Sequence, residues 1–220
     1  MNLITEPYLT QQARWPHDGR HILAQYDASS VVVYQAYCPS IGHFAAEHGY
    51  FGGDFSVQRM SWIKPNFLWM MYRSGWGTKA GQEVILAIRL QRSAFDTILA
   101  QAVHSTFKPS VYANPAAWQQ AVAQSSVRLQ WDPDHGPSGD RLPRRAIQLG
   151  LSGEILANFA LRWVLEINDI SDFVATQRPQ VATHNYAGLL TPREDVYRPA
   201  DSATIAQLEL DSIPLTRPMS

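Results

Sequence analysis

Residues 59–79 combine cationic and aromatic side chains, without any acidic residue, in a pattern that could hold an anionic ligand. The sequence is RMSWIKPNFLWMMYRSGWGTK, with three of the seven tryptophans and four cationic side chains. Clustered cations beside aromatic rings suit a ligand that has both a phosphate group and a flat base. The alternative is a solvated cationic rim around an aromatic core. The cationic candidates for such a site are Arg59, Lys64 and Arg73.

A helix is predicted at the centre of this segment, from about Pro65 to Ser74, because proline suits the first turn of a helix. Gly75 or Gly77 can end it in the left-handed conformation. Apolar side chains occur at helical spacing on both faces of the helix. We therefore expect the helix to be buried on both sides, with the rest of the chain packed around it.

Arg73 lies inside this helix, on the same predicted face as Trp69 and Tyr72. An unpaired guanidinium in a protein core costs several kcal/mol. Arg73 should therefore either pair with an internal carboxylate or line a cavity that binds an anion. In the second case Trp69 and Tyr72 are candidates for stacking on the ligand.

Gln35 is a polar side chain in the clearest predicted strand, Val31–Tyr37, which reads VVVYQAY. Strand alternation places Tyr34 on the face opposite Gln35. A glutamine in an apolar strand needs a hydrogen-bonding partner or a polar cavity. Gln35 and Tyr34 are therefore candidate ligand contacts, and a loop or bulge carbonyl is the alternative partner of the glutamine.

Gln148 poses the same question in another predicted strand, residues 145–151, which reads RAIQLGL. Its basic neighbour is Arg145. Two strand glutamines with basic neighbours suit the recognition of an amide or of a base edge. We include Gln148 and Arg145 among the candidate ligand contacts.

A proline- and glycine-rich segment, residues 131–145, is predicted to be a loop and begins with WDPDH. The later ligands of a calcium loop are missing, so we expect no metal here. The turn residues can instead hold one another by Asx hydrogen bonds. The loop can also deliver Asp132 or His135 to a cavity as an acid, a base or a partner for Arg73.

Composition and charge narrow the class of protein. The chain has 220 residues, of which 45% are hydrophobic and 17% charged, as in a globular protein with a sizeable core. The net charge of −1 provides no global field for nucleic acid, so any basic site must be local. The single cysteine, Cys38, and the lack of a signal peptide or of a bilayer-spanning apolar run predict a cytoplasmic protein without membrane contact. No P-loop, dinucleotide fingerprint or nucleophile elbow is present.

Strands and helices are predicted without strict alternation, which favours an α+β fold with a mixed or antiparallel sheet around the central helix. A second strong strand is predicted over Glu83–Leu90, and a helix from about residue 153 to residue 167. We expect one globular domain over residues 1–198 and an extended tail over residues 199–220, where several prolines interrupt a sequence of low periodicity.

Several long motifs resemble an uncharacterised bacterial and fungal family of unknown-function domains. They are SWIKPNFLWMMYRSGWGTK, AQYDASSVVVYQAY, QWDPDH and RRAIQLGL. The resemblance extends from about Arg20 to Arg198. It implies no particular activity.

A second resemblance concerns the strand VVYQAY, the short helix after it and the sequence HGYF, which look like the opening of ADP-ribosyltransferase folds. In those folds the strand commonly has tyrosine followed by histidine or arginine, whereas this chain has Gln35 there. The resemblance implies NAD as substrate and a late catalytic glutamate, for which Glu83 and Glu154 are candidates.

Two functions are consistent with these features. The first is an NAD-dependent, ADP-ribosyltransferase-like enzyme, with the cations on the pyrophosphate and Glu83, Asp132 or His135 as catalytic group. Its nicotinamide would lie between the rings of Tyr34, Trp69 and Tyr72. The second is a binding module for single-stranded nucleic acid or a modified nucleotide, without catalysis. Cations that converge in a pocket would favour the first function, and cations along an open groove the second.

Overall fold

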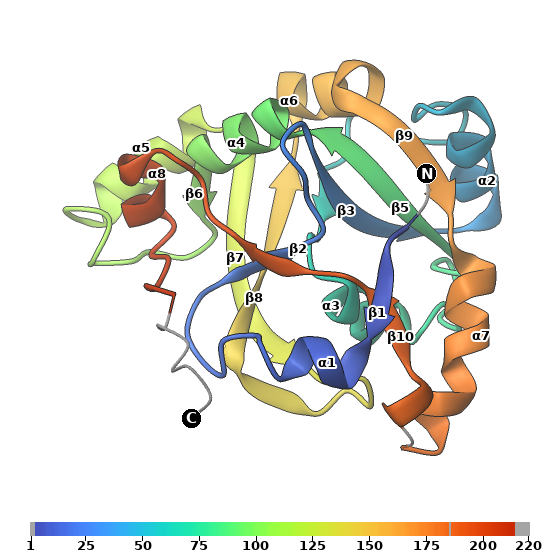
Figure 1. Ribbon diagram of the computed structural model, residues 1–220. Coiled ribbons are helices and arrows are strands. Elements are labelled where there is room, and N and C mark those ends of the chain that lie inside the picture. The colour runs from blue at the N-terminus through green and yellow to red at the C-terminus, as the bar shows by residue number, and fades with distance from the viewer. Residues whose placement is uncertain (1–2, 185, 214–220) are drawn as a thin grey trace, which may run out of the picture.

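The computed structural model describes residues 3–184 and 186–213, and its strands form two main sheets (Figure 1). The first sheet is antiparallel and has the order β3-β5-β9. The second has the order β4-β8-β7-β6 and is antiparallel except for the parallel pair β6–β7. The strands are β3 (Ser30–Tyr37), β4 (Ser61–Ile63), β5 (Val84–Gln91), β6 (Ala102–His104), β7 (Val127–His135), β8 (Arg141–Leu151) and β9 (Val164–Asp169). The predicted α+β class, with mixed and antiparallel sheets, is confirmed.

Helices pack on both sheets. Those that contact the first sheet are α2 (Pro39–His48), α3 (Phe67–Ser74), α4 (Arg92–Ala100) and α7 (Ser171–Ala182). Helix α5 (Pro115–Gln124) contacts β6, and α6 (Gly153–Asn158) continues into the π-helix η1 (Phe159–Trp163). Helix α3 also contacts β7, so it links the two sheets and lies in the middle of the molecule (Figure 1).

Strands β3 and β5 are buried on both faces, which explains their nearly continuous apolar sequences. Val31 and Val33 belong to one core cluster, whereas Val32 and Tyr34 belong to the other. A pair of backbone hydrogen bonds joins Tyr34 to Lys64, with N–O distances of 2.7 and 3.2 Å. This bridge places Lys64, which directly follows β4, beside the end of β3.

Helix α3 is the predicted central helix, and its ends have clear causes. The Asn66 side chain caps its start by accepting a hydrogen bond from the Trp69 N–H at 2.7 Å. Gly75 ends it in the left-handed conformation, with φ of 59°. Its buried side chains include Phe67, Leu68, Met70 and Met71.

The expected burial of Arg73 was wrong. Arg73 and its neighbour Tyr72 are both exposed, although the Tyr72 ring also stacks on His135 of β7. Most of the surface of α3 is therefore buried, and the Arg73 side chain is exposed to solvent.

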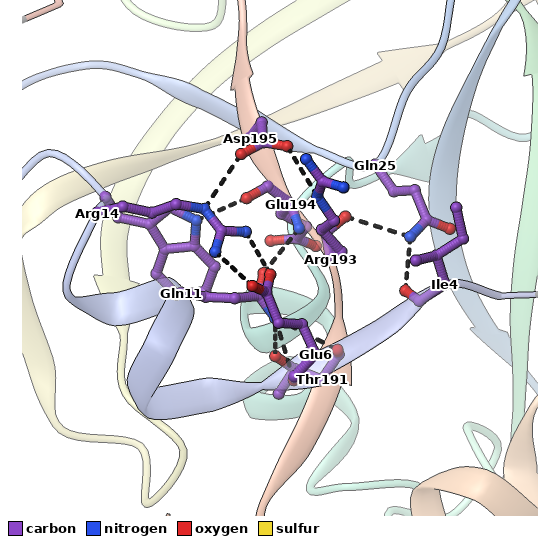
Figure 2. Close-up of polar contacts among 10 residues, drawn as sticks. Ile4, Glu6, Gln11, Arg14, Gln25, Thr191, Arg193, Glu194 and Asp195 are labelled. Carbon is purple, nitrogen blue, oxygen red and sulfur yellow. Dashed lines mark hydrogen bonds and ion pairs between the residues drawn. The ribbon is translucent and has the colours of Figure 1, made fainter.

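The two ends of the chain are joined through short strands and a network of polar contacts (Figure 2). Strand β1 pairs with β10, and β2 pairs with β11. The elements are β1 (Thr5–Pro7), α1 (Tyr8–Gln12), β2 (Ile22–Ala24), η2 (Tyr186–Gly188), β10 (Leu190–Pro192) and β11 (Asp195–Tyr197). Figure 2 shows Arg14 bonded to both Glu6 and Asp195, and Gln11 bonded to Thr191 and to the Glu194 backbone.

Glu194 connects this network to the central helix. Its carboxyl group accepts hydrogen bonds from the Phe67 N–H at 2.6 Å and from the Asn66 side chain at 3.3 Å. The residue is 1% exposed, and this burial raises the pKa of the Glu194 carboxyl well above its ordinary value. Glu194 thus holds the start of α3 through a buried carboxyl group with a raised pKa.

We expect Glu194→Gln to change how stability depends on pH. Because the folded-state pKa is raised, the native protein binds a proton that the unfolded chain releases, so its stability falls as pH rises above about 4.5. Urea unfolding of both proteins between about pH 5 and pH 7 measures the slope. The variant should lose stability less steeply than the parent protein, and identical slopes would show that Glu194 is ionised in the fold.

The structure corrects three expectations about secondary structure. Residues 131–145 are a hairpin of β7 and β8 rather than a loop, and the register shifts next to Pro133, where proline is tolerated. The helix expected up to residue 167 ends earlier, and β9 completes the first sheet instead. The tail expected to be extended contains α8 (Ser202–Gln207), and Leu208 is fully buried. Residues 214–220 of that tail lie outside the described residues.

Candidate functional site

A pocket of about 510 Å³ opens between α3, the end of β3, the β4 segment and the hairpin of β7 and β8. Five of the twelve site residues predicted from the sequence line it: Gln35, Arg59, Lys64, Arg73 and Gln148. They come from segments that are far apart in the chain, and the fold brings them together. The cations of the acid-free segment therefore converge on one pocket.

Lys64 is the most deeply buried of these cations, with 5% of its surface exposed. Burial and, to a smaller extent, the charge of Arg73 lower the pKa of the Lys64 amine to about 8, while the charge of Asp132 acts in the opposite direction. Among the described residues, no hydrogen bond or ion pair involves the amine. A substantial fraction of Lys64 is therefore neutral at mildly alkaline pH, with its nitrogen available to a ligand.

Arg59 and Arg73 are exposed and lie at the mouth of the pocket. In the described part of the chain, none of the arginine ion pairs involves Arg59 or Arg73. Of the two alternatives for Arg73, the structure shows a guanidinium that lines a cavity rather than one held by an internal carboxylate. Both charges are free to bind an anion.

Gln35 is 2% exposed and is held by its amide nitrogen, which donates to the Ser61 hydroxyl at 2.7 Å and to the Trp62 carbonyl at 3.2 Å. Because the Trp62 carbonyl can only accept, the Gln35 atom that contacts it must be the amide nitrogen rather than the amide oxygen. The Gln35 Oε1 atom has no donor among the described residues. The pocket thus contains a buried acceptor without a partner.

Asp132 lies behind the pocket wall, where Gln130 and Gln148 face each other across β7 and β8. Its carboxylate accepts from the Gln130 amide at 2.8 Å and from the Gln148 amide at 2.6 Å. Both glutamines are therefore oriented with their amide oxygens directed away from Asp132. The negative charge of Asp132 partly balances the cations and fixes two polar groups of the lining.

The predicted aromatic contacts lie outside the pocket lining. Tyr34 is fully buried on the other face of β3, with its ring 5.5 Å from that of Phe67. Trp69 is buried beside Tyr72, and the Tyr72 ring stacks on His135 at a centroid distance of 3.5 Å. Burial lowers the pKa of His135, so this imidazole is neutral near pH 7.

The two remaining predicted residues are also elsewhere. Glu83 is exposed and accepts a hydrogen bond from the Gly81 N–H at 2.8 Å, which closes the turn before β5. Arg145 is exposed, and its backbone N–H donates to the Gly19 carbonyl at 2.8 Å. Neither side chain lines the pocket.

Sequence reasoning missed several lining residues, including Tyr37, Met60, Ser61, Trp62, Gln82 and Gln130. Gln130 could have been identified as a candidate lining residue, because it is a polar residue in the predicted strand that ends at Trp131. Its pairing with Gln148 depends on the hairpin, which the proline content of residues 131–145 concealed. Tyr37 shares the Gln35 face by alternation, and burial raises the pKa of the Tyr37 hydroxyl to about 12.

A second pocket of about 330 Å³ adjoins the first and shares the lining residues Tyr37, Arg59, Met60 and Ser61 with it. Cys38 also lines this second pocket, at the start of α2. The Ser40 hydroxyl, 3.5 Å from the sulfur, is the main cause of the lowered pKa of the Cys38 thiol. The two pockets are therefore direct neighbours with a shared wall.

The fold and the pocket define an α+β domain with a cationic, amide-lined cleft. The chain belongs to the family described as Domain of unknown function (DUF4291), whose profile matches residues 21–197. None of the curated proteins matches the chain significantly. In the part of the chain that the structure describes, no helix is both long and apolar enough for a bilayer, and no group of three or more metal-binding side chains occurs.

Proposed function

We propose that the protein binds a phosphorylated nucleotide in the pocket and transfers part of it to an acceptor. The convergence of Arg59, Lys64 and Arg73 on one pocket is the observation that supports this function. Cations without carboxylate partners at the mouth of a pocket are suited to phosphate groups. Gln35, Gln130 and Gln148 also line the pocket, and their amides offer hydrogen bonds to the rest of the ligand.

NAD is the ligand that the resemblance to ADP-ribosyltransferases implies, and the structure changes which residues would serve it. The nicotinamide ring would contact Tyr37 and Trp62, which line the pocket, rather than Tyr34, Trp69 and Tyr72. Asp132 is a carboxylate next to the pocket, bonded to the lining residue Gln148, and its charge can stabilise a developing oxocarbenium-like centre. The acceptor would approach through the adjoining second pocket.

The alternative of a single-stranded nucleic-acid module gains less support. Its cations would be spread along a groove that follows the phosphate backbone. Here the three cations line one pocket, together with four glutamines. This arrangement favours a small ligand over a strand, and salt dependence separates the two. Affinity for a single strand should fall between about 50 and 200 mM salt, by roughly tenfold for every two to three phosphate contacts.

Calorimetric titration with NAD, ADP-ribose and AMP tests the proposal, with Arg73→Ala as the pocket variant. Loss of a charge-assisted hydrogen bond should weaken binding by about 10- to 100-fold, equivalent to roughly 1.5–3 kcal/mol. Lys79→Ala is the matched control, since Lys79 is an exposed cation of the same segment outside the pocket. It should bind within about twofold of the parent protein. No binding of any of the three nucleotides, or equal losses in both variants, would contradict the proposal.

A further inference from the structure

Lys64 differs from the other cations of the pocket in depth and in chemistry. We propose that Lys64 is a nucleophile that forms an imine with the aldehyde carbon of a phosphorylated sugar. The substrate class is then a sugar phosphate or sugar nucleotide with a free reducing end. This inference rests on the proposed function, because it assumes that Arg59 and Arg73 bind phosphate at the same pocket.

The cations lie at different depths in the pocket, so they would contact different ends of the ligand. Lys64 is 5% exposed, whereas Arg59 and Arg73 are exposed at the mouth. A phosphate bound by the two arginines would leave the rest of the ligand directed inward, toward the Lys64 amine. The atom that meets the amine is therefore a carbon at some distance from the phosphate, and not the phosphorus itself.

The polar groups that line the pocket beside the cations are amides and hydroxyls, including those of Tyr37 and Ser61, and such groups suit the hydroxyl groups of a ligand. Gln35 presents a buried Oε1 atom without a donor among the described residues. The amide nitrogens of Gln130 and Gln148 each donate one N–H to Asp132, so the amide oxygen and the second N–H of each remain for the ligand. Amide oxygens accept from sugar hydroxyls but gain nothing from a phosphate oxygen. The lining thus matches a hydroxylated carbon chain with an anionic end.

The chemistry needs an unprotonated amine, and the pocket provides one. With a pKa of about 8, roughly a tenth of Lys64 is neutral at pH 7, far more than for a lysine in water. A desolvated lysine beside a second cation is a known arrangement for imine formation. The groups that act on its charge are Arg73 and Asp132.

The reaction balances without an oxidant or reductant. The Lys64 nitrogen adds its electron pair to the carbonyl carbon of the open-chain sugar and forms a carbinolamine. The nitrogen then gives up its second proton as the carbon–oxygen bond breaks, and the oxygen leaves as water. The products are one imine and one water molecule, and hydrolysis returns both starting compounds.

The lysine content of the chain makes a direct test possible, because the sequence has three lysines: Lys64, Lys79 and Lys108. The full-length protein is incubated with ADP-ribose or ribose 5-phosphate, treated with sodium borohydride to convert an imine into a stable amine, and mapped by peptide mass spectrometry. We expect one adduct, on Lys64, at a yield at least tenfold above that on Lys79 or Lys108. Arg73→Ala should lower this yield about tenfold or more, and Lys79→Ala should leave it unchanged.

AMP is the matched ligand control, because its ribose carbon is blocked by adenine and cannot form an imine. Calorimetry on the same samples separates the two proposals. Binding of ADP-ribose and AMP without an adduct on Lys64 would overturn the nucleophile and leave the nucleotide site intact. Absence of binding would overturn the proposed function itself. Equal labelling of all three lysines would also overturn the inference, and Lys64→Arg, which keeps the charge, should show no adduct at position 64.

Discussion

Replacement of Lys64 by methionine is expected to stabilise the protein while it removes one of the three cations that line the nucleotide pocket. A base whose pKa is lowered in the folded state decreases the free energy of unfolding at any pH below that pKa. The native state must then either bury the charge or release the proton. The shift from 10.5 to about 8 corresponds to about 3 kcal/mol below pH 7. Methionine has a similar length and no charge, so Lys64→Met should raise the unfolding free energy by up to that amount.

The pH dependence of unfolding tests whether the charge of Lys64 lowers the stability of the protein. The stabilising effect of Lys64→Met should be largest below about pH 7 and should vanish above about pH 10.5, where the lysine is neutral in both states. Urea unfolding at pH 6.5 and near pH 10.5 measures both limits, and Lys79→Met serves as the exposed control. A variant that is destabilised equally at both pH values would show that Lys64 contributes packing alone. A loss of stability in exchange for ligand binding is a common trade-off at binding sites.

Replacement of Arg144 by alanine is expected to be the most destabilising single change among the polar residues of the hairpin. Arg144 and Asp134 form a buried ion pair with an N–O distance of 2.7 Å, and their side chains are 6% and 2% exposed. Arg144 also donates to the Pro16 carbonyl at 2.6 Å and lies over the Trp15 ring at 5.3 Å. Removing it leaves the Asp134 charge buried and unpaired, which typically costs about 3–5 kcal/mol.

The neighbouring Arg145 provides the matched control. It has the same chemistry one position along β8, but its side chain is exposed. Arg145→Ala should change the unfolding free energy by no more than about 0.5 kcal/mol. Chemical denaturation of the two variants side by side gives the comparison. Equal effects of Arg144→Ala and Arg145→Ala would mean that the buried pair does not hold the hairpin to the N-terminal segment.

The parts of the fold that the sequence predicted have local causes. Strands β3 and β5 have apolar, β-branched sequences, and α3 is delimited by residues that favour helix ends. The three cations of the pocket were found because they lie in one short segment. Alternation along β3 also placed Tyr34 opposite Gln35, and the structure confirms this with Gln35 in the pocket and Tyr34 in the core.

The parts that were missed depend on contacts between distant segments. Arg73 was expected to be buried because both faces of α3 look apolar, but which side of the helix stays open depends on how the hairpin and the chain ends pack. Glu194 was not singled out, and its role arises from its position at the start of α3, 127 residues away in sequence. Trp69 and Tyr72 were expected to stack on a ligand, whereas they lie with His135 next to the pocket wall.

A crystal structure of the protein with ADP-ribose tests the central claim most directly. The account predicts density for the phosphates between the guanidinium groups of Arg59 and Arg73, with the ribose end directed inward to Lys64 and within hydrogen-bonding distance of the Gln35 Oε1 atom. Density at any other surface, or an empty pocket at saturating ligand concentration, would contradict it.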